Sequence, residues 1–253
     1  MRLIVADDYA ALSRAAADVL AATIAAEPTA AILAATGNTP MGAYEDLAAR
    51  RRRGEIDASR LRVFQLDEYL GLPVDDPRSL FGWTRRSFVE PLGVPDTNVV
   101  RLPGDAADPA AACRAYEAAV AAGGGIDLAV LGLGPNGHLG FNEPPAAADA
   151  PTRVVDLTPE SIVSNGAYWG GSDRVPRRAL TAGMTVVLAS RRVLLLVSGE
   201  HKREILRRTL EGPVTPAVPA SYLRRAADVT VITDRAAVGS SAPNPPGEAA
   251  VAE

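Results

Sequence analysis

Short apolar runs alternate with longer segments of helical periodicity from residue 2 to residue 234. The apolar runs are typical of buried strands and span residues 2–6, 30–36, 61–66, 126–134, 192–199 and 228–234. The helical segments that follow most of them span residues 7–26, 41–54, 79–92, 108–124 and 200–212. This alternation predicts an α/β fold, with a doubly wound, mostly parallel sheet and helices on both faces.

The chain has the length of one large α/β domain. Its 253 residues would be few for two independent cores. We expect a single domain over residues 1–238, followed by a disordered tail at 239–253 that is rich in Gly, Pro, Ser and Ala. Residues 145–178 show only a weak pattern of helix or strand. We interpret about 157–178 as a small lid, with an ordinary surface excursion as the alternative.

Charge and cysteine content argue against several classes of protein. The net charge of -4 gives no electrostatic reason to expect a nucleic-acid partner. Cys113 is the single cysteine, so an intrachain disulfide and a cysteine metal cluster are both excluded. The first twenty residues carry acidic side chains where a signal peptide would be apolar, and no run approaches the length that spans a membrane. We therefore expect a cytoplasmic protein without a membrane partner.

Polar side chains follow the strand expected at 30–36. Thr36, Gly37, Asn38 and Thr39 lie between this strand and the next helix. Glycine permits a tight turn, hydroxyls can donate, and the start of a helix presents free N–H groups to an anion. The segment is a candidate phosphate-binding loop, with a plain strand–helix turn as the alternative. It has neither the lysine of a Walker loop nor the spacing of a dinucleotide fingerprint.

Two adjacent carboxylates follow the strand expected at 61–66. Asp67 and Glu68 could both be solvated turn residues. The functional interpretation places one of them in a cleft as a general base with its pKa tuned by burial. Side chains alternate along an extended chain, so the two cannot both point inward. We expect one to be catalytic and the other structural.

The stretch "LGLGPNGHLGFNEP" follows the buried strand at 126–134. Its glycines bend the chain repeatedly, which would let His138 project from a turn and move protons near neutral pH. Glu143 could hold the imidazole in one tautomer. A satisfied structural histidine is the alternative, and we assign His201, the second histidine, no chemistry. Neither histidine has partners at the spacing of a metal site, so we expect no metal.

The order and spacing of these segments resemble one family. The stretches "TGNTPMGAY", "LDEYLGLP", "GPNGHLGFNEP" and "VSGEHK" are similar to those of the glucosamine-6-phosphate deaminase (isomerase) family, from the N-terminus to about residue 234. The combination "DEY…GLP" with "NGH…FNEP" is specific to that family. The related 6-phosphogluconolactonases share the fold and a similar glycine–histidine turn.

The resemblance implies a Rossmann-like sandwich with a small lid that converts glucosamine 6-phosphate and water to fructose 6-phosphate and ammonia, without a metal or organic cofactor. His138 would open the sugar ring, Asp67 would move a proton from C2 to C1, and Glu143 would support His138. The loop at 36–39 would hold the phosphate, with Lys202 supplying charge.

One departure from the family concerns the phosphate. Ala167 falls where the family has a phosphate-binding arginine, so a bidentate, charge-assisted contact is missing. Arg174, Arg177 or Arg178 could replace it. Glucosamine 6-phosphate stays the expected substrate, with another amino-sugar phosphate as the alternative.

Two further departures concern the histidine and regulation. Many members have Asp at the position of Asn136. An amide there can form hydrogen bonds but cannot stabilise an imidazolium by charge, so Glu143 would be the remaining anionic partner. Allosteric members use a basic pair that includes the position of Arg153 and a lysine at that of Val155. We therefore expect no effector control through this pair, and a monomer or a homo-oligomer.

Two rival functions share the fold. A lactonase related to the 6-phosphogluconolactonases would use His138 on an ester and would not need Asp67. A sugar-phosphate sensor domain would need no catalytic groups, and the presence of Asp67, His138 and Glu143 together argues against it.

Overall fold

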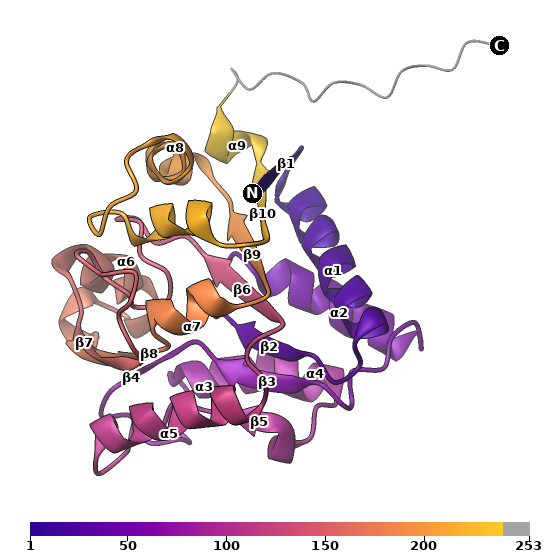
Figure 1. Cartoon of the computed structure of the whole chain (residues 1–253), viewed down its shortest axis with the longest axis horizontal. Helices are drawn as coiled ribbons and strands as arrows, with labels where there is room; N and C mark the ends of the chain where they lie inside the picture. The colour runs from indigo at the N-terminus through magenta and orange to yellow at the C-terminus, as the bar shows by residue number, and fades with distance from the viewer. Residues whose placement is uncertain (240–253) are drawn as a thin grey trace.

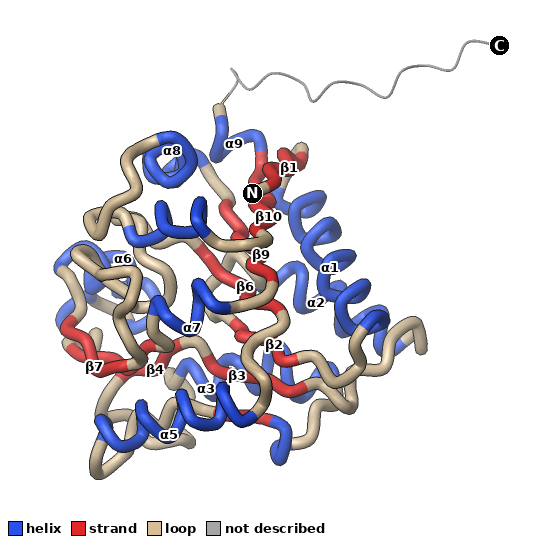
Figure 2. Tube along the Cα trace, viewed as in Figure 1, coloured by secondary structure: helices blue, strands red, loops and turns tan. Residues whose placement is uncertain are grey.

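The computed structural model describes residues 1–239. Within them, a seven-stranded sheet forms the centre of the molecule, in the order β1-β10-β9-β6-β2-β3-β5 (Figures 1 and 2). Its strands are β1 (Arg2–Ala6), β2 (Ala31–Ala34), β3 (Arg62–Gln65), β5 (Val99–Val100), β6 (Leu128–Gly132), β9 (Arg192–Val197) and β10 (Val229–Asp234). All neighbouring strands pair in parallel. The predicted parallel sheet is confirmed, and each predicted run contains one of these strands.

Helices cover both faces of the sheet (Figure 1). One face carries α1 (Tyr9–Ala26), α2 (Met41–Arg52) and the segment that runs from α3 (Leu80–Thr84) to α4 (Glu90–Leu92). The other face carries α5 (Pro109–Ala122), α7 (Met184–Ala189), α8 (Arg203–Glu211) and the short α9 (Arg235–Val238). Asp8 and Asp108 cap α1 and α5 through side-chain bonds to backbone N–H groups, as their positions predict.

Strand β2 shows why the apolar runs are continuous. Its alternate side chains point to opposite faces, so Ala31 and Leu33 enter one hydrophobic cluster while Ile32 and Ala34 enter the other. All four are buried. A strand between two helical layers has no polar face, which is the physical origin of the runs in the sequence.

Helix α1 corrects one expectation. It is long and apolar enough, by length and composition, to cross a membrane. However, Leu12, Ala16, Leu20 and Ile24 lie one turn apart and are buried in the core against the sheet. The helix therefore packs one face on the sheet and leaves the other face exposed.

A second, antiparallel sheet was not predicted. It contains β4 (Asp67–Tyr69), β8 (Arg178–Thr181) and β7 (Arg153–Asp156), in that order, and α6 (Pro159–Trp169) joins β7 to β8. The weakly patterned region 145–178 therefore has regular structure. Asp67 and Glu68 lie in a strand, and the interpretation of both as solvated turn carboxylates is wrong because both are buried.

The remaining differences are local. The helix expected at 79–92 contains a π-helical turn at Arg85–Val89, and the helix expected from residue 200 begins as a 3-10 turn, Glu200–Lys202. Of the predicted tail at 239–253, residues 240–253 lie outside the described residues.

Candidate active site

The order of the strands reverses between β2 and β6. From β2 the chain adds β3 and β5 outward on one side, and from β6 it adds β9 and β10 on the other. Ligands of open α/β sheets bind at the carboxyl ends of the strands at such a switch point. A cavity of ≈ 510 Å³ lies there, a volume that suits a small molecule. Its lining includes the residues of all three predicted loops: Thr36, Gly37, Asn38, Thr39, Asp67, His138 and also Lys202.

The loop at 36–39 presents backbone N–H groups to this cavity. Gly37 adopts φ +88°, a left-handed conformation that favours glycine. Helix α2 begins at Met41, and within residues 1–239 the N–H groups of the loop residues before it, 37–39, have no hydrogen-bond acceptor, so they are available to an anion. The Tyr9 hydroxyl donates to the Asn38 carbonyl (2.9 Å) and accepts from the Gly42 N–H (2.9 Å), which ties the loop to the start of α2.

Asp67 is the buried carboxylate of the cavity. Its side chain is only 7% exposed, and within residues 1–239 it has no hydrogen-bond partner among the side chains or amides. Burial, and then the charge of the neighbouring Glu68, raise the pKa of Asp67 to about 8. A carboxylate of this kind is a stronger base than an exposed one and is free to take a proton from a ligand.

Glu68 has a different environment. Its two oxygens accept from the N–H groups of Tyr69 (2.8 Å), Leu80 (3.0 Å) and Phe81 (2.9 Å), and from the Gln65 amide (3.0 Å). The carboxylate thereby satisfies the first N–H groups of α3. The expected division holds in the geometry: Asp67 lines the cavity, and Glu68 binds the backbone beside it.

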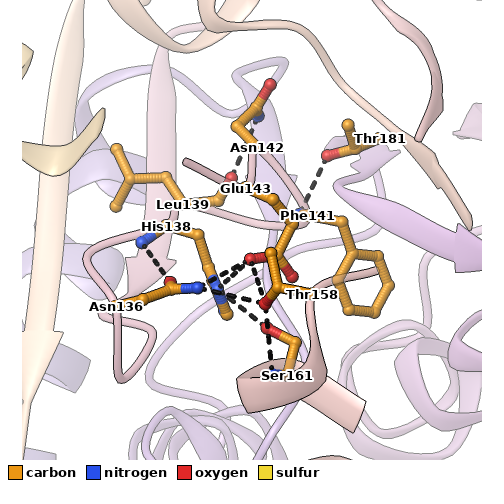
Figure 3. Close-up of polar contacts among 9 residues, drawn as sticks. All are labelled: Asn136, His138, Leu139, Phe141, Asn142, Glu143, Thr158, Ser161 and Thr181. Atoms are coloured by element: carbon orange, nitrogen blue, oxygen red, sulfur yellow. Dashed lines mark hydrogen bonds and ion pairs between the residues drawn. The ribbon is translucent and has the colours of Figure 1, made fainter. Parts of the chain in front are cut away.

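His138 is held by a network on one side of its ring (Figure 3). Its Nδ1 lies 3.2 Å from Glu143 Oε2 and 3.2 Å from Ser161 Oγ. Burial alone would raise the pKa of Glu143, but the hydrogen bond and charge of His138, together with bonds from Ser161 and Asn136, lower it to about 2. The ionised Glu143 favours the proton on Nδ1, so Nε2 is the ring nitrogen that can exchange protons with a ligand.

The backbone at Gly134 determines where the imidazole can lie. A Cβ atom at this position would come within 2.2 Å of His138 Nε2 and Cδ2. Because the ring packs directly on the glycine backbone, any larger residue at 134 would displace the imidazole. The glycines of this stretch therefore bend the chain and also let the imidazole ring of His138 lie directly against the backbone.

Asn136 contacts the carboxylate of Glu143 and not the imidazole (Figure 3). Its amide nitrogen donates to Glu143 Oε2 (2.9 Å), and its oxygen accepts from the backbone N–H of His138 (3.2 Å). The Thr158 hydroxyl also donates to Glu143 Oε2, at 3.1 Å. Asn136 therefore orients the group that orients the histidine, and Glu143 is the anion of the network.

Lys202 completes the positive side of the cavity. It lies in the 3-10 turn after β9, and within residues 1–239 it forms no ion pair. Burial lowers the pKa of its ammonium group. An anion in the cavity would supply the missing counter-charge. His201, to which we assigned no chemistry, also lines the cavity.

Helix α6 forms the side of the cavity that the sequence did not reveal. Ser164, Asn165 and Tyr168 line the cavity, whereas Ala167 does not. The three arginines considered as replacements for a guanidinium at 167 are also absent from the lining: Arg174, Arg177 and Arg178. A cap signal, Thr158 followed by Pro159 and Glu160, was available in the sequence and could have located the helix. Within residues 1–239, no group of three or more His, Cys, Asp or Glu side chains could hold a metal ion.

The doubly wound sheet and the carboxylate–imidazole cavity at its switch point place the chain among the α/β enzymes. Over residues 6–232 it matches the family described as glucosamine-6-phosphate isomerases/6-phosphogluconolactonase, and the chain belongs to this family.

Relatives with assigned activities cover almost the whole chain. A glucosamine-6-phosphate deaminase of Halothermothrix orenii is 39% identical over 94% of this chain and 98% of its own length. One from Streptomyces avermitilis is 40% identical over 94% and 91%. The solved structure of a monomeric glucosamine-6-phosphate deaminase has a TM-score of 0.92 at 38% identity, covering 94% of this chain and 98% of that one. A 6-phosphogluconolactonase from Leishmania guyanensis shares the fold at 22% identity and a TM-score of 0.76, covering 96% and 99%.

Proposed function

We propose that this protein is a glucosamine-6-phosphate deaminase, which converts glucosamine 6-phosphate and water to fructose 6-phosphate and ammonia. One observation carries the proposal: a buried carboxylate with a raised pKa and an anchored imidazole line the same cavity as the loop at 36–39. A lactonase needs the histidine and the anion-binding loop but has no use for Asp67.

His138 is assigned the opening of the sugar ring. Its Nε2 takes the proton of the C1 hydroxyl and delivers a proton to the ring oxygen, which breaks the C1–O5 bond and gives the open-chain aldehyde. The imidazolium formed in between is stabilised by Glu143, whose lowered pKa keeps it ionised throughout the working range. Asn136 and Thr158 hold that carboxylate in place.

Asp67 is assigned the proton transfer between carbons. It removes the proton from C2 and returns it to C1, while the nitrogen at C2 loses a proton and the oxygen at C1 gains one, so the amino aldehyde becomes a C2 imine with a C1 hydroxyl. Water adds to the imine and ammonia leaves. A protonated amine at C2 would favour the ionised form of Asp67, so substrate binding would generate the base from a group that is mostly neutral in the empty site.

The phosphate is assigned to the loop at 36–39 and to Lys202. The backbone N–H groups of the loop and the Lys202 ammonium present positive charge, so the dianion could fix the sugar while the base acts. Helix α6 would serve as the lid of a single domain over residues 1–238, because its Ser164, Asn165 and Tyr168 line the cavity.

We further propose a cytoplasmic enzyme that acts as a monomer. The lone Cys113 is a buried free thiol, which suits a reducing compartment. Arg153 donates within its own chain to Asn142 Oδ1 (2.9 Å), and Val155 stands where an effector site would need a lysine. Sedimentation of the purified protein with and without sugar phosphates tests both the monomer and the absence of effector-driven assembly.

Ammonia release from a panel of phosphorylated and free amino sugars tests the function. Asp67→Asn should lower kcat by about 1,000-fold, since a general base typically contributes ~10²–10⁴-fold. Asp75→Asn, at an exposed carboxylate, is the matched control. Hydrolysis of 6-phosphogluconolactone that survives Asp67→Asn, without ammonia release by the unmodified enzyme, would establish the lactonase in its place.

A further inference from the structure

Tyr168 reaches the cavity from the lid helix α6, next to the position where an arginine is missing. It lines the same cavity as the loop at 36–39, while Ala167 does not. Its side chain is 42% exposed, which is unusual for a large aromatic residue packed beside a site. No role in the proton transfers described above falls to it.

The hydroxyl of Tyr168 is arranged to donate into the cavity. The phenol lies beside the backbone of Asn38, which lowers the pKa of Tyr168. Within residues 1–239, the phenol proton has no acceptor. Partial burial raises the pKa of Tyr168 more than the Asn38 backbone lowers it, so the phenol keeps its proton at neutral pH. The group therefore offers one unused O–H donor beside the expected anion.

Trp83 fixes this hydroxyl relative to the loop. The rings of Trp83 and Tyr168 pack edge to face with their centroids 5.2 Å apart. On its other side, Trp83 Nε1 donates to Met41 Sδ at 3.1 Å, and Met41 is the first residue of α2. The same tryptophan thus contacts the lid and the helix whose start forms the loop, so Tyr168 keeps its place above Asn38.

We propose that Tyr168 is the phosphate-recognising residue of the lid, and that its hydroxyl donates to a phosphoryl oxygen of the substrate at the 36–39 loop. It would stand in for the guanidinium that is missing at position 167. The identity of the substrate rests on the proposed function. The new claim is the contact between Tyr168 and the phosphate.

A tyrosine contact differs in kind from an arginine contact. The phenol contributes one neutral hydrogen bond, whereas a guanidinium contributes two charged ones. The charge on the phosphate would then be balanced by Lys202 and the amides of the loop, and Tyr168 would add orientation. Loss of the hydroxyl should weaken ground-state binding and leave the chemical steps, which occur at C1 and C2, almost unchanged.

Tyr168→Phe tests the proposal because it removes one oxygen and keeps the ring on Trp83. Titration calorimetry with inorganic phosphate should show about five- to tenfold weaker binding, the usual effect of one neutral hydrogen bond. KM for glucosamine 6-phosphate should rise by the same factor, with kcat within about twofold. Tyr222→Phe, at a buried tyrosine outside the cavity lining, is the matched control and should change neither quantity.

The outcomes separate this proposal from the proposed function. If the unmodified enzyme releases ammonia but Tyr168→Phe binds phosphate as tightly as before, the contact is wrong and the function stands. A fall in kcat with unchanged phosphate affinity would also overturn the contact, since it would place Tyr168 in the chemistry. If phosphate binding weakens as expected while no ammonia is released from any amino sugar, the contact stands and the function fails.

Discussion

The two sides of the cavity are built in different ways. The floor, formed by residues 36–39, 67 and 134–143, follows the carboxyl ends of the parallel strands, and its acid–base groups Asp67 and Glu143 are buried. The roof, formed by residues 158–169, is a single helix between two short antiparallel strands, and its Ser164 and Tyr168 are exposed. The buried floor can hold reacting groups in fixed geometry, and the more exposed roof is the part proposed above as the lid. Under the proposals above, the floor performs the proton transfers and binds the phosphate, and the roof adds the recognition contact of Tyr168.

The largest effect on activity within this comparison is expected when a charged group of the floor is replaced. Glu143→Gln keeps the size of the side chain but removes the anion that faces His138 Nδ1 at 3.2 Å. An amide cannot stabilise the imidazolium by charge, so kcat should fall by about 100-fold with little change in KM. Steady-state kinetics of ammonia release measure both. Glu160→Gln, an exposed glutamate of the roof, is the control and should retain full activity.

A second test compares the two adjacent carboxylates of the floor through stability. The pKa of Asp67 is raised from 3.8 to about 8, so the folded state holds a proton that the unfolded chain releases between these values. The free energy of unfolding therefore falls as pH rises from about 4 to about 8. Asp67→Asn removes this dependence and should be more stable than the unmodified protein at pH 8, by on the order of 2 kcal/mol, with the gain vanishing near pH 4.

Glu68→Gln should change the free energy of unfolding in the opposite direction and destabilise the protein. Its carboxylate accepts from three backbone N–H groups and one side-chain amide, and a glutamine nitrogen cannot accept. Leaving buried N–H groups of α3 without a partner should cost about 1–3 kcal/mol at pH 6. Urea unfolding of both variants at pH 4, 6 and 8 provides the measurements. Equal destabilisation by the two variants at pH 8 would mean that Asp67 is a structural residue like Glu68.

The sequence predicts the floor better than the roof for a physical reason. Strands of the central sheet are buried on both faces, so each one produces a continuous apolar run. Strands β4, β7 and β8 have three or four residues each, and charged residues interrupt every one of them. A segment such as Arg153–Asp156 then carries too little pattern to be distinguished from a loop. The glycines and aromatic residues of 165–171 further obscured α6.

The same contrast applies to individual site residues. Asp67, His138 and Glu143 could be proposed because few residue types can move protons, and they follow predicted strands. Tyr168 and Ser161 belong to common types whose placement depends on how α6 packs over the cavity. Nothing local in the sequence distinguishes them from other residues of a helix.

The smallest effect is expected where roof and floor meet. Ser161, on α6, places its hydroxyl 3.2 Å from His138 Nδ1, and the same side chain helps to lower the pKa of Glu143. Ser161→Ala removes one neutral bond and leaves the carboxylate of Glu143 in place, so kcat should fall by about threefold. Ser172→Ala, at an exposed serine beyond the helix, should have no effect. A fall as large as that of Glu143→Gln would show that the lid orients the imidazole as strongly as the carboxylate does, and the separation of chemistry from recognition would then fail at this contact.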